Sequence, residues 1–85
     1  MKKTRILGLY ITDRVKDAVQ VQNILTKYGC SIKTRLGLHE VVNEYCSTSG
    51  LILLELTGST DDMDKLEKEL KSVAELQVQK MEFDD

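Results

Sequence analysis

The sequence predicts an α+β protein with a split βαβ, ferredoxin-like fold, whose elements run strand, helix, strand, strand, helix, strand. Three observations lead to this prediction. Apolar runs typical of strands alternate with two stretches of helical periodicity, the six elements fill all 85 residues, and no proline or low-complexity stretch marks a linker. We therefore expect a single domain covering residues 1–85.

The first half of the chain predicts a central strand, a helix and a more exposed strand. Residues 4–12, TRILGLYIT, carry apolar side chains at both alternating positions, which is typical of a strand inside a sheet. Thr12 or Asp13 offers an N-cap for a helix over residues 15–28, and Gly29 ends that helix.

The strand expected over residues 31–38, SIKTRLGL, alternates in polarity. Ile32, Leu36 and Leu38 share one side, and Lys33 and Arg35 share the other. This pattern is typical of a half-exposed strand at or near an edge of the sheet.

The second half predicts a strand, a helix and a last strand. The segment of residues 39–50 is too long for a tight turn. It predicts a ragged extension of the flanking strands around a loop. Residues 51–56, LILLEL, predict a second central strand, and residues 57–62 supply a Ser or Thr N-cap for the second helix. Residues 76–83 change parity between Val78 and Met81, which indicates a bulge or a strand end that contacts a neighbour.

Right-handed crossovers between these elements give an antiparallel sheet of order 4-1-3-2 with both helices on one face. The other face then carries one apolar parity of the central strands, either the set Ile6, Tyr10, Leu51 and Leu53 or its opposite. Because such a face would be exposed in a monomer, we expect a second copy to cover it. The predicted assembly is a homodimer or a dimer of dimers.

Composition argues against several classes of partner. The net charge of −2 and the scattered lysines and arginines disfavour direct binding of nucleic acid. No leader-like segment and no apolar stretch of membrane-spanning length is present, so we expect a cytoplasmic protein without a membrane partner. Two unpatterned cysteines predict reduced thiols rather than a disulfide framework.

Catalytic and metal-binding patterns are weak. His39 and Cys46 have the residue types of a base and a nucleophile, but no third group orients them, so we do not expect an enzyme. The same residues with Cys30 are the only set of soft ligands, and they lack the spacing of a zinc or nickel site. We expect no cofactor, and a metal-responsive domain remains an alternative.

Short motifs give the chain a family resemblance. The pattern IxDRxxDAxxVNxIL is carried, with a one-residue displacement before Asn23, by Ile11, Asp13, Arg14, Ala18, Val21, Asn23, Ile24 and Leu25. Residues 34–38, TRLGL, and residues 51–56 resemble two further strands of the same family. The chain thus resembles the small ACT-like proteins known as iron-only hydrogenase system regulators.

That resemblance implies an ACT-like regulatory domain that self-associates and binds a small effector between subunits. It implies an effector site formed by Asp13 and Arg14, in the loop after the first strand, with Arg35 and Gly37 of the second strand. The loop lacks the glycine of ACT domains that bind amino acids, which disfavours amino-acid sensing of that kind. Asp13 as a helix cap and Arg35 as a surface side chain remain the alternative interpretations.

Two classes of function stay open at this point. The first is a non-catalytic regulatory module that senses a small molecule or a protein partner as a homo-oligomer. The second is an assembly module whose partner is another copy or another protein, without a small-molecule ligand. Glu55 lies within an apolar strand and needs a cationic partner, which Lys33, Arg35 or another chain could supply.

Overall fold

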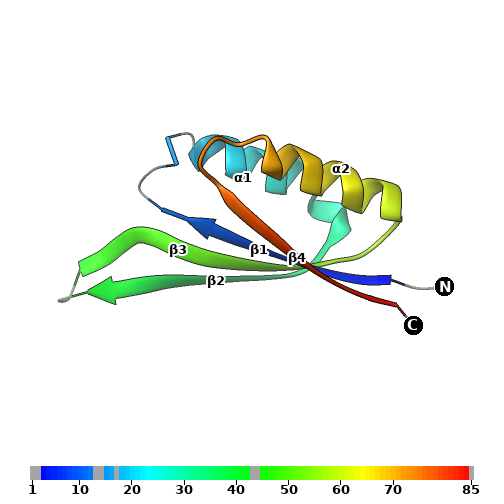
Figure 1. Cartoon of the computed structure of the whole chain (residues 1–85), viewed down its shortest axis with the longest axis horizontal. Helices are drawn as coiled ribbons and strands as arrows, with labels where there is room; N and C mark the ends of the chain where they lie inside the picture. Colours follow the sequence, from blue (N-terminus) through cyan, green and yellow to red (C-terminus); the bar gives the residue numbers. More distant parts are fainter. Residues whose placement is uncertain (1–2, 13–14, 17, 43–44, 85) are drawn as a thin grey trace.

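The computed structural model describes residues 3–12, 15–16, 18–42 and 45–84. It describes no side chain from residue 38 to residue 49 inclusive. The elements follow the predicted order (Figure 1). They are β1 (Lys3–Ile11), α1 (Ala18–Lys27), the 3₁₀ turn η1 (Gly29–Ser31), β2 (Ile32–Val42), β3 (Tyr45–Leu56), α2 (Thr60–Lys71) and β4 (Gln77–Asp84).

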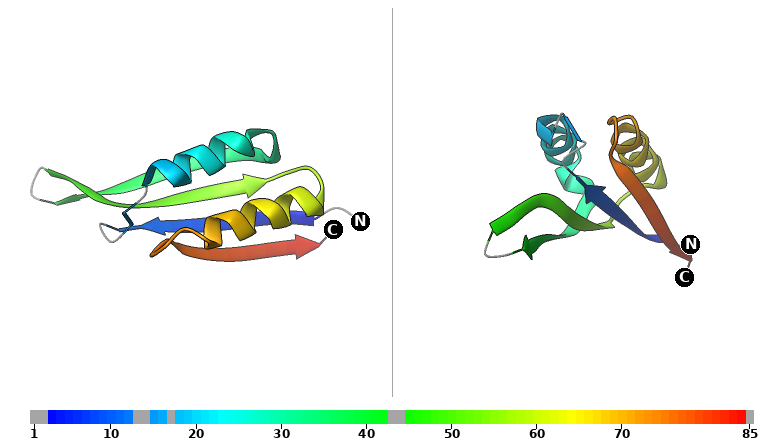
Figure 2. Two further views of the ribbon diagram at one scale, coloured as in Figure 1. Left: turned by 90° about the horizontal axis from the view of Figure 1, so that it is seen from above. Right: turned by 60° about the vertical axis from the view of Figure 1, so that its left-hand side comes forward.

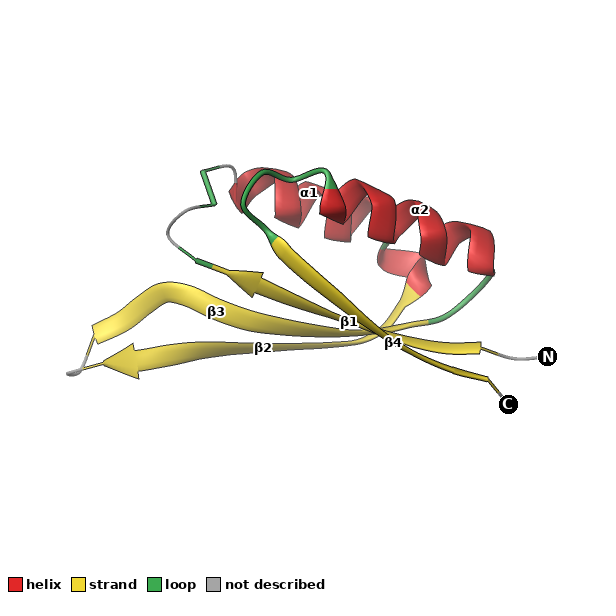
Figure 3. Ribbon diagram, in the orientation of Figure 1, coloured by secondary structure: helices red, strands yellow, loops and turns green. Residues whose placement is uncertain are grey.

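The four strands form one antiparallel sheet of order β2-β3-β1-β4, which confirms the predicted order read from the opposite edge. β1 and β3 are the central strands, as their two-sided apolar pattern predicts. Both helices lie side by side on one face of this sheet (Figures 2 and 3). Within the described ranges, no helix is long and apolar enough to cross a bilayer.

The hydrophobic core lies between the helices and the sheet. Alternate residues of β1 and β3 point toward the helices, since Leu7 is paired with Leu54 and both are fully buried. The helices complete the core with Val21, Ile24, Leu25, Met63, Leu66 and Leu70. The apolar sides of the two helices therefore cover only one face of the sheet.

The helix starts differ in how well the sequence predicts them. α1 begins at Ala18, three residues after the predicted start, and the proposed cap Asp13 lies outside the described residues. For α2, Ser59 is the N-cap among the several hydroxyl residues, since its side chain accepts a hydrogen bond of 3.2 Å from the Asp62 backbone N–H.

A β-bulge changes which side chains of β2 share a face. Ile32 pairs with Leu56 and Thr34 pairs with Glu55, so Lys33 is an extra residue opposite the bond between them. Ile32 therefore packs against the helix-covered core, whereas Leu36 lies on the other face. The expectation that Ile32 and Leu36 share one face is wrong, because alternation holds only where the pairing is regular.

In β4, the irregularity that the sequence pattern indicates is absent. Its pairing with β1 runs from Gln77 to Asp84 without any shift, so the bulge considered for the parity change is absent from this ladder. Val78 packs against the core, and Met81 lies on the uncovered face. The strand simply presents apolar residues to opposite faces in its two halves.

Residues 39–42 of β2 and residues 45–50 of β3 form a two-stranded ribbon that extends beyond the rest of the sheet (Figure 1). β1 pairs with β3 only as far as Gly50, and the β2–β3 register shifts between His39 and Val41. The predicted ragged extension of the strands is confirmed. The ribbon contributes to the elongated shape of the molecule, 47 × 22 × 18 Å.

Candidate functional site

The four residues of the predicted effector site fall in different parts of the molecule. Asp13 and Arg14 lie outside the described residues, so the structure does not test their role. Arg35 is exposed on the helix side of β2, where its guanidinium donates a 3.0 Å hydrogen bond to the Gln22 side chain of α1. Gly37 lies two residues further along β2, opposite Ile52.

The face of the sheet away from the helices carries apolar side chains on all four strands. Strand pairing puts Leu36, Leu53 and Gly8 in one row, and Ile6 and Met81 in a neighbouring row, because directly paired residues point the same way. The side chains of Leu36, Met81 and Phe83 are each half exposed or more. We call this surface the open face; its described apolar side chains are Ile6, Tyr10, Leu36, Leu51, Leu53, Met81 and Phe83.

One carboxylate interrupts the open face. Glu55 lies between Ile6 and Thr34, and it accepts a 3.0 Å hydrogen bond from the Thr34 hydroxyl. The Lys33 ammonium lies 3.9 Å from its other oxygen. The expectation that Lys33 could serve Glu55 is confirmed, and the bulge explains how Lys33 reaches it.

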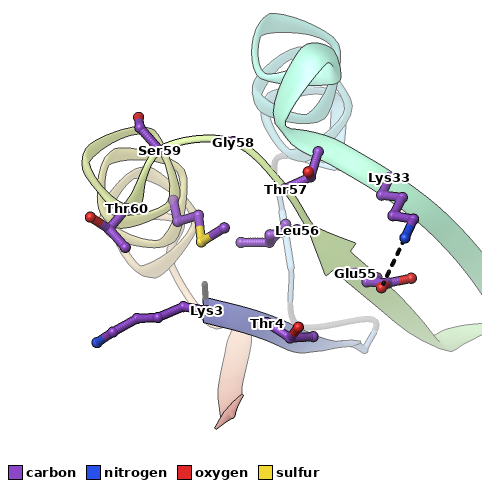
Figure 4. A pocket seen from close by; sticks show the side chains of 10 residues that line it. Lys3, Thr4, Lys33, Glu55, Leu56, Thr57, Gly58, Ser59 and Thr60 are labelled. Carbon is purple, nitrogen blue, oxygen red and sulfur yellow. Dashed lines mark ion pairs between the residues drawn. The ribbon is translucent and has the colours of Figure 1, made fainter. Parts of the chain in front are cut away.

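A cavity of about 550 Å³ opens at the end of the sheet where β1 starts and β3 ends (Figure 4). Leu56 and Met63 lie against its apolar inner side, and the turn before α2 closes one side. We call it the α2 cavity. Its lining residues are Lys3, Thr4, Lys33, Glu55, Leu56, Thr57, Gly58, Ser59, Thr60 and Met63.

The α2 cavity is polar at its rim but carries little net charge. Lys33 is paired with Glu55, and the Lys3 ammonium lies 3.6 Å from Glu82 and 3.9 Å from Asp84. Hydroxyl groups of the turn complete the rim. The arrangement suits a small polar molecule with an apolar part better than a bare anion, because both cations already have carboxylate partners. No motif in the sequence marks this turn as a binding site.

A buried ion cluster holds α2 against β1 and β4. Arg5 is 4% exposed, and its guanidinium lies 2.6 Å from Glu82, 2.8 Å from Asp64 and 3.3 Å from Glu67. Lys71 and Lys80 bind the other oxygen of Glu67. The hydrogen bond from Arg5 lowers the pKa of the Glu82 carboxyl below its ordinary value. Arg5 lies on the same alternating positions of β1 as Leu7 and Leu9, and this is the sequence signal that could have indicated its burial.

A second polar contact joins the helices. The Tyr28 hydroxyl donates to Glu69, and the Lys27 ammonium lies 3.2 Å from the same carboxylate. These donors lower the pKa of Glu69, and the hydrogen bond to Glu69 raises the pKa of Tyr28. Both polar clusters hold elements together, and each charge in them has a partner.

The fold separates Cys30 from His39 and Cys46. His39 and Cys46 belong to the two strands of the distal ribbon. Cys30 is exposed in η1, before the opposite end of β2, and the seven residue steps from Ile32 to His39 span roughly 23 Å. Among the described residues, no group of three His, Cys, Asp or Glu side chains could hold a metal ion.

The fold and the sheet order define this chain as a ferredoxin-like α+β domain. Nine chains of solved structures match it. One of them is the uncharacterized protein TM1266 from Thermotoga maritima, with a TM-score of 0.78 and 25% sequence identity over 98% of this chain and 100% of that one. No family model matches the chain, and no curated protein does.

Proposed function

We propose that this chain is a non-catalytic, ACT-like regulatory module that works as a homo-oligomer and responds to a small effector. The observation that carries the proposal is the open face, which spans both central strands and leaves Leu36, Met81 and Phe83 half exposed. An apolar surface of this kind on a small domain is typical of an interaction site. A sheet with one covered and one open face gives each copy the same surface, and two identical surfaces can form a two-fold interface.

The arrangement of the polar groups supports a regulatory role over a catalytic one. In the described part of the chain, the buried charges around Arg5 and the Tyr28–Glu69 contact are mutually paired and lie within the fold. A general base or nucleophile needs a reacting atom within reach and a group that orients it. The α2 cavity offers polar contacts for binding, with hydroxyls and paired charges.

The sequence resemblance supports a finer proposal, that the regulated process is an iron-only hydrogenase system. The chain would act through a partner protein, because its six elements are used by the fold and provide no DNA-reading arm within the described residues. Hydrogenase maturation genes beside the gene for this chain would support this proposal. A genome that lacks iron-only hydrogenase would contradict it.

Thermal-shift screening of amino acids, nucleotides and organic acids tests the proposal that the chain binds a small effector. An effector at 100 times its Kd stabilises the protein by about 2.7 kcal/mol, which gives a readable rise in Tm. Absence of any stabilising compound, with self-association intact, would favour the pure assembly module instead.

Two variants locate the site of any compound found. Arg35→Ala tests the predicted site, and Lys33→Ala tests the α2 cavity, which Lys33 lines and Arg35 does not. The two cations are exposed on the same strand, so each variant is the other's control, and each should change stability by only about 0.5 kcal/mol. Loss of binding in Arg35→Ala alone supports the predicted site. Loss in Lys33→Ala alone moves the effector to the α2 cavity.

A further inference from the structure

Strand β1 continues past the point at which β3 leaves the sheet. The pairing of β1 with β3 ends at Arg5 and Leu56, whereas β4 stays paired with β1 as far as Lys3. After Leu56 the chain turns away toward α2 through Gly58, whose φ is 93°. The sheet therefore has a notch beside the first residues of β1, and the α2 cavity lies in this notch (Figure 4).

The backbone of Lys3 faces this notch. The Thr57 N–H donates a 2.8 Å hydrogen bond to the Ser31 carbonyl, just before β2, so Thr57 directs its backbone groups toward that strand. Neighbouring residues of a strand direct these groups to opposite sides, so Leu56 faces Arg5, and Lys3 faces the side that β3 has left. Among the described residues, no backbone hydrogen bond outside the helices and strands involves Lys3. Its N–H and C=O are therefore available to a ligand.

A second donor and acceptor line the cavity. Figure 4 shows the Lys33–Glu55 ion pair across the cavity from Lys3. The Oε1 atom of Glu55 accepts a 3.0 Å hydrogen bond from the Thr34 hydroxyl, whereas its Oε2 atom lies 3.9 Å from the Lys33 ammonium. A charge-assisted hydrogen bond is about 2.8 Å long, so this looser pair retains a donor and an acceptor for a ligand group.

The chemistry of these groups favours a neutral amide. An amide group carries an N–H donor and a carbonyl acceptor, which match both the Lys3 backbone and the Lys33–Glu55 pair. A carboxylate has no donor for the Lys3 carbonyl, and an ammonium has no acceptor for the Lys33 side chain. A free amino acid has both, but its two charges would leave water for a site whose own charges are already paired.

The inner side of the cavity adds an apolar requirement. Leu56 and Met63 line it from the core, so an aliphatic group placed against them is removed from water. The volume of about 550 Å³ is in the range of small-molecule sites. Lys3 is the one described residue of β1 that offers its backbone here, so the cavity suits a molecule the size of one residue better than a long strand.

We infer that the α2 cavity binds a small neutral amide with an aliphatic side chain. One amide group of the ligand pairs with the N–H and C=O of Lys3, as a short continuation of the β1 ladder. A second amide group meets Lys33 and Glu55, and the aliphatic side chain lies against Leu56 and Met63. The inference rests on the proposed function, since it names the chemical class of the effector.

The test uses N-acetyl-leucinamide, which is neutral and carries two amide groups and one aliphatic side chain. NMR titration of ¹⁵N-labelled protein measures its Kd, and we expect the largest shifts at the backbone amides of Lys3, Thr57 and Gly58. N-acetyl-glycinamide, which lacks the aliphatic group, should bind about tenfold more weakly. Free leucine and 4-methylpentanoate, which keep that group but lack the two amides, should also bind about tenfold more weakly.

Variants of the cavity test the side-chain contacts. Lys33→Ala and Glu55→Ala should each raise the Kd of N-acetyl-leucinamide about tenfold, because each removes a hydrogen bond to a charged group. Arg35→Ala is the matched control, an exposed cation on the same strand that does not line the cavity. Urea unfolding reports the fold of each variant. Glu55→Met is a second variant that removes the acceptor and keeps the length of the side chain.

The outcomes separate this inference from the proposed function. No binding of N-acetyl-leucinamide at millimolar concentration, or equal binding of 4-methylpentanoate, overturns the amide site, and a different effector would leave the proposed function intact. A capped tripeptide with a central leucine that binds about tenfold tighter shows a strand site and overturns the small ligand. A wild type that binds the amide as a 9.7 kDa monomer supports the cavity and overturns the proposed self-association.

Discussion

Arg5 shows how one residue of a strand can join three elements. It lies on the helix-covered face of β1, in line with Leu7 and Leu9, yet it is a cation and 4% exposed. Its five N–H donors reach Glu82 on β4 and both Asp64 and Glu67 on α2. In the described part of the chain, no buried side-chain nitrogen or oxygen lacks a hydrogen-bond partner. The cluster is therefore complete, and removal of its centre leaves buried carboxylate behind.

We predict that Arg5→Ala lowers the free energy of unfolding by about 3 kcal/mol, because Glu67 stays buried with part of its charge uncompensated. Urea denaturation measures the change. Lys3→Ala is the control, since Lys3 on the same strand makes only exposed ion pairs at 3.6 and 3.9 Å and should change stability by about 0.5 kcal/mol. Equal losses in the two variants would show that burial of the cluster is unimportant.

Strand β2 contains two irregularities, and each has its own structural role. The bulge at Lys33 turns Ile32 toward the core and brings the lysine to Glu55. Beyond the shift between His39 and Val41, the same strand leaves the sheet and forms half of the ribbon. Bulges commonly redirect side chains or end regular pairing, and β2 does both.

The bulge predicts opposite behaviour for two apolar residues that alternate identically in sequence. Ile32→Ala should destabilise the chain by about 2 kcal/mol, because Ile32 packs against the core. Leu36→Ala should change the unfolding of the monomer by only about 0.5 kcal/mol, since Leu36 is half exposed on the open face. Urea unfolding at a concentration where the chain is monomeric makes the comparison. Similar losses in the free energy of unfolding would indicate that both residues lie on one face and would contradict the bulge.

The paired charges of the molecule make the stability of the fold depend on pH. The pKa of Glu82 is lowered by the hydrogen bond from Arg5, and the pKa of Glu69 by those from Tyr28 and Lys27. A carboxyl whose folded pKa is depressed stabilises the protein above its unfolded pKa of about 4.5, and this stabilisation is lost as the pH falls through the folded value. Tyr28, whose pKa is raised above 10.0, contributes below that pH and loses its contribution in more alkaline solution.

We therefore predict constant stability across neutral pH and a fall below about pH 4.5. Glu82→Gln should lower stability at neutral pH and flatten the acid fall, because one depressed carboxyl is gone. Glu75→Gln is the control, an exposed carboxylate with no ion pair among the described residues. Tm measured from pH 3 to pH 8 reports both effects, and an unchanged acid slope in Glu82→Gln would contradict the role of Arg5.

The sequence by itself determined the element order, the strand order and the existence of an open apolar face. These features follow from local patterns, since two-sided apolar runs belong to central strands and helical periodicity leaves one covered face. The sequence pattern indicates Ile6, Tyr10, Leu51 and Leu53 as one of two possible sets for that face, and the strand pairing puts them there. The effector site of Asp13, Arg14, Arg35 and Gly37 stays a prediction.

Only the tertiary structure decided which parity is covered, where the bulge falls and how the charges meet. Ile32 and Leu36 separate because of pairing with β3, and Arg5 is buried because α2 and β4 bring carboxylates to it. The α2 cavity likewise forms where three segments distant in sequence converge. Such features depend on register and on contacts between distant residues, which local periodicity does not encode.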